Sequence, residues 1–230
     1  MSETVLWLIA FGLVGIGVWQ WRRLLAACRR ANRVDWGGDM FNLIDGFNRI
    51  FCYRYHRLNV LGLRLPKTGA AIVVSNHVSG LDPMLLIASA RRPLRFLIAR
   101  EQYRRFGLKW LFDGAGCIPV NRERRPERAL RAALRALADG EVVALFPHGK
   151  IHLDSDPPRK IKAGALRLAQ LSGAPILPLR IDGVRGAGHV VRGALLRGHA
   201  GVKAYPLIDP EGWDPTELSE EIQAILDGHR

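Results

Sequence analysis

Cysteine, lysine and acidic residues are all scarce in this 230-residue chain. The three cysteines, Cys28, Cys52 and Cys117, are scattered and odd in number, which argues against a disulfide scaffold and is typical of a reducing cytosol. The sequence also lacks zinc-ligand spacing, an RNP-like aromatic run and a basic zipper, so it gives no nucleic-acid-binding signature. No ligand cluster predicts a metal site, and no cofactor is expected.

The shortage of acidic residues leaves the chain strongly basic. Lys and Arg total 34 against 21 Asp and Glu, which gives a net charge of +13, and only six of the basic residues are Lys. Such an excess suits anionic lipid headgroups, phosphorylated substrates or nucleic acid, although a solvated basic surface without a partner is the alternative. The length predicts one domain with its own core and a small N-terminal appendage.

Residues 4–21 contain no charged side chain and begin that appendage. As a helix they would rise roughly 27 Å, about the thickness of the hydrocarbon core of a membrane. Five arginines follow at positions 22, 23, 29, 30 and 33, so the positive-inside rule predicts an anchored protein on the cytoplasmic face of the (inner) membrane. A lipoprotein-like box ending at Cys28, a secretory signal and a buried core helix are weaker alternatives. Ser2 and Glu3 give no basic region for a secretory signal.

Apolar residues recur at three- and four-residue steps in the next segment. They are Phe41, Ile44, Phe47, Ile50, Phe51 and Leu58, with Arg49, Arg54 and Arg57 between them. This pattern predicts an amphipathic helix with its apolar face in lipid and its arginines at phosphates, and a surface helix packed on the domain is the alternative. We therefore divide the chain into a membrane anchor with an amphipathic helix, residues 1–57, and an α/β domain, residues 58–230.

Beyond Pro66, apolar runs alternate with helical patterns. Strands are expected at residues 71–75, 94–99, 117–120, 141–146, 176–182, 190–191 and 202–207. Helices are expected at residues 83–90, 101–114, 126–139, 163–172 and 216–227. The alternation predicts an α/β fold with a mixed sheet flanked by helices, and it makes the Gly-rich stretch 183–201 a loop or hairpin of uncertain role.

His77 and Asp82 lie five residues apart, directly after the apolar run 70–74. An imidazole is well suited to accept a proton near neutral pH, and a neighbouring carboxylate can orient it. Ser79 is the only evident nucleophile beside them, so the attacking hydroxyl group is expected to belong to the substrate. The alternative is a packed histidine with Asp82 as the N-cap of a helix that has Pro83 at its first position.

Four segments in order resemble the motifs of a known family. The pattern Asn-His-x-Ser-x-x-Asp-Pro at residues 76–83 resembles the first motif of the glycerolipid acyltransferases, the 1-acylglycerol-3-phosphate O-acyltransferase family. Residues 116–122, 146–150 and 174–179 resemble the second, third and fourth motifs. The third motif departs from the family pattern, because His148 stands where Glu is usual and Lys150-Ile151 where Thr-Arg is usual. The second has Asn121 where Asp is common.

The resemblance implies an acyltransferase with no metal and no acyl-enzyme. His77 would deprotonate the acceptor hydroxyl and Asp82 would orient His77, while backbone amides after the strand would stabilise the oxyanion. Arg122 and Lys150 would bind the acceptor phosphate, with His148 and Gly149 as further substrate contacts. The donor would be acyl-CoA or acyl-carrier protein, and the acceptor a lysophospholipid, by default lysophosphatidate giving phosphatidate.

Three alternatives to that function stay open. The acceptor could be a different lysolipid, since the departures fall where the acceptor should bind. The protein could instead be a lipid hydrolase in which His77 activates water or Ser79. It could also be a binding module that holds anionic membrane lipid without chemistry.

Overall fold

The structure, a computed structural model, describes residues 3–103, 107–121 and 126–230, and its centre is a mixed sheet of seven strands. The spatial order is β1-β7-β6-β2-β5-β3-β4. The strands are β1 (Asn59–Leu61), β2 (Ala71–Ser75), β3 (Leu94–Ala99), β4 (Ile118–Val120), β5 (Val142–Leu145), β6 (Ile176–Asp182) and β7 (Gly201–Ala204). All neighbours pair in parallel except β6 and β7, which are antiparallel.

Helices cover both faces of this sheet. On one face, Ile72 and Val74 of β2 share a core with α6 (Pro126–Ala138), α7 (Gly164–Ser172) and α9 (Pro215–Leu226). On the other face, Ala71 and Val73 pack with α3 (Asp82–Ser89). Because both faces are covered, β2 is a continuous apolar run instead of an alternating one. The predicted α/β fold is confirmed.

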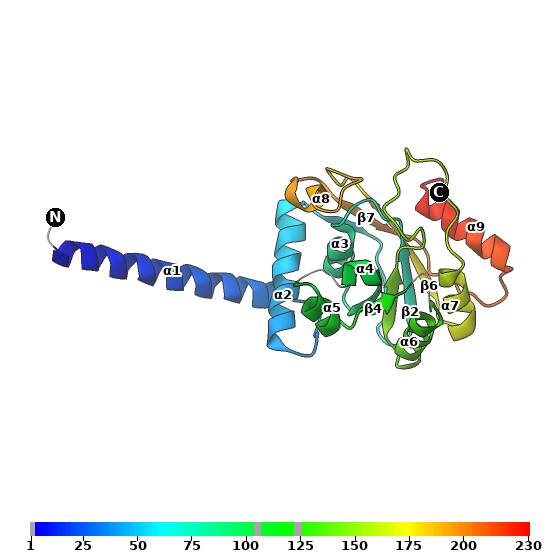
Figure 1. Ribbon diagram of the computed structural model, residues 1–230, viewed down its shortest axis with the longest axis horizontal. Coiled ribbons are helices and arrows are strands. Elements are labelled where there is room, and N and C mark those ends of the chain that lie inside the picture. The colour runs from blue at the N-terminus through cyan, green and yellow to red at the C-terminus, as the bar shows by residue number, and fades with distance from the viewer. Residues whose placement is uncertain (1–2, 104–106, 122–125) are drawn as a thin grey trace.

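The first helix, α1 (Glu3–Ala31), projects away from the domain with its N-terminus farthest out (Figure 1). Its C-terminal part packs on α2 (Asp39–Ile50), and the two backbones meet where a Cβ added to Gly46 would lie 1.9 Å from the carbonyl oxygen of Cys28. Cys28, near the C-terminal end of α1, is thus buried between the two helices. Among the residues that the structure describes, no helix is long and apolar enough to cross a membrane.

The predicted amphipathic helix is α2, which continues into a π-helical turn, η1 (Phe51–Tyr55). Its polar residues Asp45, Asn48 and Arg49 are buried, whereas Phe47 is 54% exposed. Arg49 Nε donates to Asp45 Oδ2 over 2.6 Å, and its guanidinium also donates to three carbonyl groups at the end of α3. The expectation that Arg49 lies at lipid phosphates is therefore wrong, because the last turn of α3 exposes carbonyl oxygens that need a donor.

Most predicted elements are confirmed to within two residues, and strands β2, β3 and β6 have the expected bounds. The segment 101–114 instead contains two short helices, α4 (Arg100–Tyr103) and α5 (Lys109–Gly114), with residues 104–106 outside the description. The predicted strand at 190–191 is wrong: these residues form a turn that leads into α8 (Arg192–Leu195). Their backbone contacts the loop after β2 and, within the part of the chain that the structure describes, pairs with no strand.

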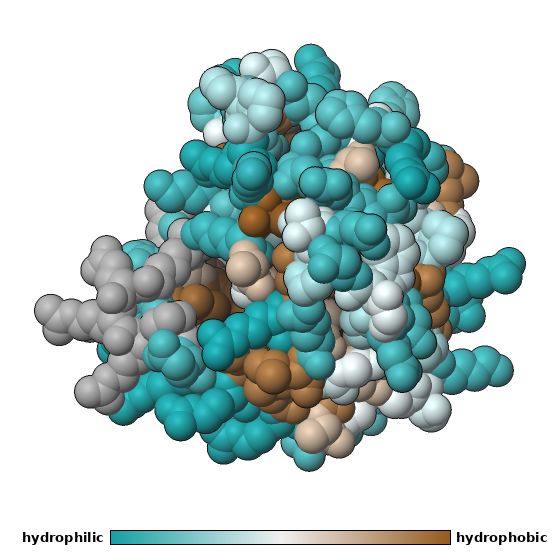
Figure 2. All heavy atoms as spheres, turned by 90° about the vertical axis from the view of Figure 1, so that its right-hand side faces the viewer, coloured by the Kyte–Doolittle hydropathy of each residue, from teal (hydrophilic) through white to brown (hydrophobic). Residues whose placement is uncertain are grey.

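The molecule differs in polarity from side to side. The face opposite the projecting α1 is mainly hydrophilic, with scattered apolar residues (Figure 2). On α1 itself the side chains of residues such as Leu8, Phe11 and Trp19 are more than half exposed. The apolar surface is therefore concentrated on the projecting helix and beside it.

Candidate active site

Three of the four motifs lie at one edge of the sheet. The first follows β2, the second contains and follows β4, and the third follows β5, while the fourth lies at the start of β6. These four strands run in one direction, so their carboxyl ends lie at the same edge. In open α/β sheets this edge is where ligands bind.

Asp82 is the centre of the hydrogen-bond network at that edge. Its fully buried carboxylate accepts from His77 Nδ1 at 2.7 Å, from the amides of Val78 and Ser79 at 2.6 and 2.9 Å, and from Ser79 Oγ at 2.7 Å. Two backbone amides and a hydroxyl group thus stabilise the anion without solvent. The helix begins at Asp82, with Leu81 at the N-cap and no side-chain cap, so the interpretation of Asp82 as the N-cap is wrong.

His77 is held on two sides. Its Nδ1 donates to Asp82, and its ring stacks on Phe146 at a centroid separation of 4.2 Å and an interplanar angle of 16°. The side chain is 20% exposed, while its carbonyl oxygen accepts from the amide of His152 at 2.7 Å. Because Asp82 occupies Nδ1, Nε2 is the ring nitrogen that can accept a proton from a substrate. The third motif therefore positions His77 through Phe146, which sequence reasoning missed.

The hydrogen bonds of the first motif bear on the Ser79 alternative and on the expected oxyanion site. Ser79 is fully buried, and its Oγ both donates to Asp82 and accepts from the amide of Leu81, so it is not placed to act as a nucleophile. The amides of Val78 and Ser79 donate to Asp82, and that of Gly80 to the carbonyl of His189 at 3.4 Å. These three amides have partners within the protein and are not free to bind an oxyanion.

Asn76, the first residue of the motif, has a structural role that spacing could not reveal. Its buried side chain donates to the carbonyl of Ile181 at 2.9 Å and accepts from the amide of the same residue at 2.7 Å. Asn76 thereby continues the pairing of β2 with β6 after the backbone ladder ends. This places the first motif firmly beside β6.

His148 lies away from solvent. It is 2% exposed, its Nε2 lies 3.3 Å from Gln223 Nε2 and 3.8 Å from Asp227 Oδ1 of the C-terminal segment, and its ring is 4.9 Å from that of His152. Burial lowers the pKa of His148, and neighbouring His152 acts in the same direction, although Asp227 acts in the opposite direction. His148 therefore packs the third motif against α9, and this conformation does not support direct contact with a substrate.

The other two substrate contacts predicted in the third motif, Gly149 and Lys150, are more accessible. Gly149 has φ = 73°, and a Cβ there would lie 2.8 Å from the ammonium of Lys162, so both the backbone and the neighbour favour glycine. Lys150 is exposed next to it. Arg122 of the second motif lies outside the described residues, which resume at Pro126 after Asn121.

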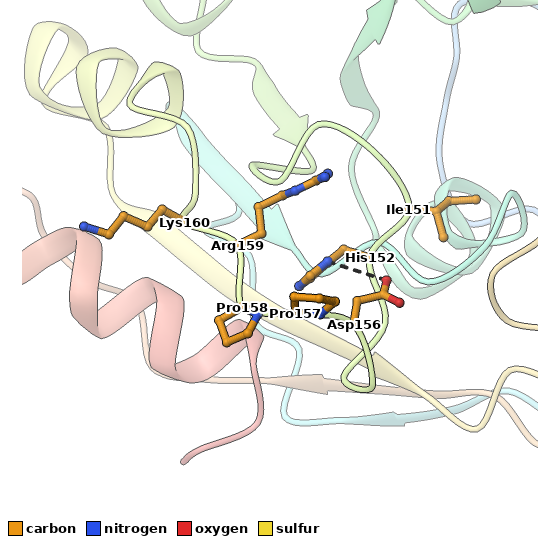
Figure 3. A pocket seen from close by; sticks show the side chains of 7 residues that line it. All are labelled: Ile151, His152, Asp156, Pro157, Pro158, Arg159 and Lys160. Carbon is orange, nitrogen blue, oxygen red and sulfur yellow. Dashed lines mark ion pairs between the residues drawn. The ribbon is translucent and has the colours of Figure 1, made fainter.

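A cavity of about 520 Å³ lies within the loop that follows the third motif. Figure 3 shows its lining from residues 151–160, with the ion pair of His152 and Asp156, 3.6 Å, marked by a dashed line. Arg159 and Lys160 add positive charge to the lining. The loop is joined to the active site because the His152 amide donates to His77.

Comparisons with known proteins agree with the motif pattern. Residues 57–182 match the family model described as Acyltransferase. The chain is 27% identical over 119 residues to a 1-acyl-sn-glycerol-3-phosphate acyltransferase of Borreliella burgdorferi, covering 51% of this chain and 47% of that protein. It is 30% identical over 118 residues to an N-acylphosphatidylethanolamine synthase of Arabidopsis thaliana, covering 47% and 41%. The matched part thus spans about half the length of these relatives.

A solved structure has the same fold. It is the 1-acyl-sn-glycerophosphate acyltransferase PlsC from Thermotoga maritima, with a TM-score of 0.67 and 23% identity over 85% of this chain and 81% of that one. The family model covers more than half of the chain and includes all four motifs. This chain belongs to the acyltransferase family, as its resemblance to the glycerolipid acyltransferases predicts.

Proposed function

We propose that this protein transfers a fatty acyl group from an acyl thioester to the hydroxyl group of a lysophospholipid. The observation that carries the proposal is the buried Asp82 carboxylate, which holds Nδ1 of a partly exposed His77 at the ligand-binding edge of the sheet. Family membership supports acyl transfer, and the names of the bacterial relatives support 1-acylglycerol-3-phosphate, lysophosphatidate, as the default acceptor.

In the proposed reaction, His77 Nε2 takes the proton of the acceptor hydroxyl as its oxygen attacks the thioester carbonyl. The carbon–sulfur bond then breaks, and the leaving thiolate receives the proton from the imidazolium. The products are the acylated lipid and free CoA or carrier-protein thiol. The buried carboxylate of Asp82 stabilises the imidazolium while it exists.

The acceptor phosphate is proposed to bind beside the third motif. Lys150 is exposed there, and Arg159 and Lys160 line the neighbouring cavity. Arg122 keeps its predicted role as a second phosphate contact. We expect Lys150→Ala to raise KM for lysophosphatidate about tenfold with a smaller change in kcat, because a contact to a distant phosphate contributes mostly uniform binding. Steady-state kinetics with a neutral monoacylglycerol as the comparison acceptor would show whether the effect depends on the phosphate.

Contact with a membrane is part of the proposal. Its support is the exposed apolar surface of α1, together with the exposed side chains of Met40 and Phe47 on α2. Such a surface suits the environment of a substrate dissolved in a bilayer. Location on the cytoplasmic face is inferred from the arginines that follow residue 21.

The test is acyl transfer by the purified protein from acyl-CoA and from acyl-carrier protein. The acceptors would be lysophosphatidate, other lysophospholipids and phosphatidylethanolamine, which is included because one relative is an N-acylphosphatidylethanolamine synthase. We expect thiol release and product formation in equal amounts, and a loss of about 10³-fold in His77→Ala. Thioester loss without an acylated lipid would instead indicate a hydrolase. No transfer to any acceptor by the folded protein would overturn the proposal.

A further inference from the structure

Residues 183–200 cover the loop that carries His77 and Asp82. The amide of Gly188 donates to the carbonyl of Val78 at 2.8 Å, and a Cβ added to Gly80 would lie 2.1 Å from the carbonyl oxygen of Val190. The two backbones are thus in direct contact with no room for a side chain between them. Residues 188–190 therefore lie directly against the loop that carries His77 and Asp82.

The outer surface of this segment is apolar and basic. Val190, Val191 and Leu195 are 49%, 60% and 66% exposed. Three arginines, Arg185, Arg192 and Arg197, are interleaved with them, and residues 183–208 contain no Asp or Glu. Exposed apolar side chains among uncompensated arginines match the two layers of an anionic bilayer, which offers hydrocarbon beneath phosphate groups.

The same surface continues onto the helix that carries the exposed aromatic residues. Tyr55 Oη donates to the carbonyl of Leu195 at 2.7 Å, and Tyr55 stacks on Phe51, which stacks on Phe47. Figure 1 shows α8 at the end of α2, on the side of the domain from which α1 projects. Segments far apart in the sequence therefore present one apolar surface on the side of the anchor.

We propose that residues 183–200 form a second membrane-contact element, which inserts Val190, Val191 and Leu195 into an anionic bilayer and couples that insertion to the loop of His77 and Asp82. The proposal rests on the proposed function only for the role of that loop. A bilayer is preferred to a soluble partner because the segment adjoins the aromatic row Phe47, Phe51 and Tyr55 of α2 and η1. The charge of the segment is also of one sign.

Hydrogen exchange of the full chain tests the contact. Peptides from residues 183–200 would be compared in solution, on phosphatidylcholine vesicles and on vesicles that contain phosphatidylglycerol. We expect exchange about tenfold slower on the anionic vesicles, with α1 protected at the same time. In the triple variant Val190→Ser, Val191→Ser, Leu195→Ser the local protection disappears while α1 stays protected.

Two further variants keep the interpretation specific. Leu171→Ser is the matched control, because Leu171 is 57% exposed on α7, on the side of the domain away from α1 (Figure 1), and this change should leave the protection of 183–200 intact. A second triple variant replaces the arginines of the segment: Arg185→Gln, Arg192→Gln, Arg197→Gln. It should weaken the preference for anionic over neutral vesicles, and it tests the contact if the apolar variant fails to fold.

Coupling to catalysis is measured as a ratio of rates. For the apolar triple variant, turnover of a lysolipid in vesicles relative to a short-chain monomeric analogue should fall about tenfold, and for Leu171→Ser the ratio should not change. Exchange of 183–200 that is identical in solution and on vesicles, with α1 protected, would overturn the proposal. So would lipid-independent protection that grows with protein concentration. An absence of acyl transfer would refute the proposed function. The hydrogen-exchange result would still decide whether residues 183–200 contact the membrane.

Discussion

At the scale of single residues, the first motif is organised by the carboxylate of Asp82. That carboxylate accepts four hydrogen bonds, one of which fixes the orientation of His77. Asp82 uses one oxygen for His77 and two amides, and the other for Ser79 Oγ. The loop geometry and the orientation of the base therefore depend on one anion. Ser79 acts through Asp82, as a positioning residue.

Substitutions at these two positions should differ in size. Asp82→Asn is expected to lower kcat by about 10³-fold, because the amide cannot both accept from the backbone and stabilise an imidazolium. Ser79→Ala removes one donor to the carboxylate and should lower kcat roughly tenfold, the cost of a hydrogen bond to a charged group. Rescue by Ser79→Thr, with the far-ultraviolet circular dichroism unchanged, would separate positioning from loss of fold. Equal losses in both variants would contradict this hierarchy.

His148 makes the stability of the protein dependent on pH. Its pKa is lowered by burial, with His152 and the charge of Arg159 acting in the same direction, while Asp227 and a backbone hydrogen bond with Arg159 oppose them. The unfolded chain then binds a proton at a higher pH than the folded one, so stability is lost as the pH falls from about 6.5 towards the folded pKa. We expect His148→Gln to reduce the fall in urea midpoint between pH 7.5 and pH 5.5.

The matched control for that experiment is His229→Gln, at an exposed position in the C-terminal tail. His56 limits the size of the effect, since burial lowers its pKa as well and it remains in the variant. An unchanged pH dependence in His148→Gln would show that its charge is not what destabilises the fold in acid.

The residue pattern predicted the catalytic pair because both members lie within six residues of one loop. It could not predict that His148 is buried, because the burial comes from Gln223 and Asp227, about 75 residues later. Nor does the pattern exclude Ser79 as a nucleophile, because it does not show what its hydroxyl group contacts. Its hydroxyl is occupied by a turn whose conformation the spacing does not specify.

At the scale of elements, α2 buries the polar residues Asp45, Asn48 and Arg49, while Phe47 is exposed. The ion pair of Arg49 and Asp45, with side chains 6% and 1% exposed, joins α2 to the end of α3. We expect Arg49→Leu to lower the free energy of unfolding by about 3 kcal/mol, because it leaves a buried carboxylate without its partner. Urea denaturation measures this, and Asp45→Leu combined with Arg49→Leu should recover part of the loss. A cost below 1 kcal/mol for the single change would contradict the role of the pair.

Periodicity predicted that α2 is a helix but not which face is buried. The three- and four-residue steps are the same whether the apolar stripe faces the core or a lipid, and the carbonyls of α3 that attract Arg49 are about 40 residues away. The buried strands β2 and β6 could be predicted from the sequence more readily, because each contains a continuous run of buried apolar residues. The short run at 190–191 resembled them, yet it lies on the surface.

At the scale of the whole molecule, binding to a membrane through positive charge and binding through apolar surface differ in their response to salt. The net charge of +13 would by itself give binding that salt reverses. The exposed apolar residues of α1 would give binding that persists in salt. The face shown in Figure 2 is mainly hydrophilic, so an exposed apolar residue away from α1 is a suitable control for insertion of apolar side chains.

Substitutions in the projecting part of α1 decide between the two. Leu8 and Phe11 are 72% and 73% exposed, and Leu8→Asn with Phe11→Asn should lower vesicle partitioning roughly 100-fold, since burying each side chain contributes about 1.5–3 kcal/mol. The free energy of unfolding should change by less than about 0.5 kcal/mol, because these side chains lie outside the core. Trp213→Ser, two residues before α9 begins, is the control and should bind vesicles as the unaltered chain does. If high salt releases the unaltered chain and the α1 variant binds equally well, the contact is electrostatic and α1 is not the anchor.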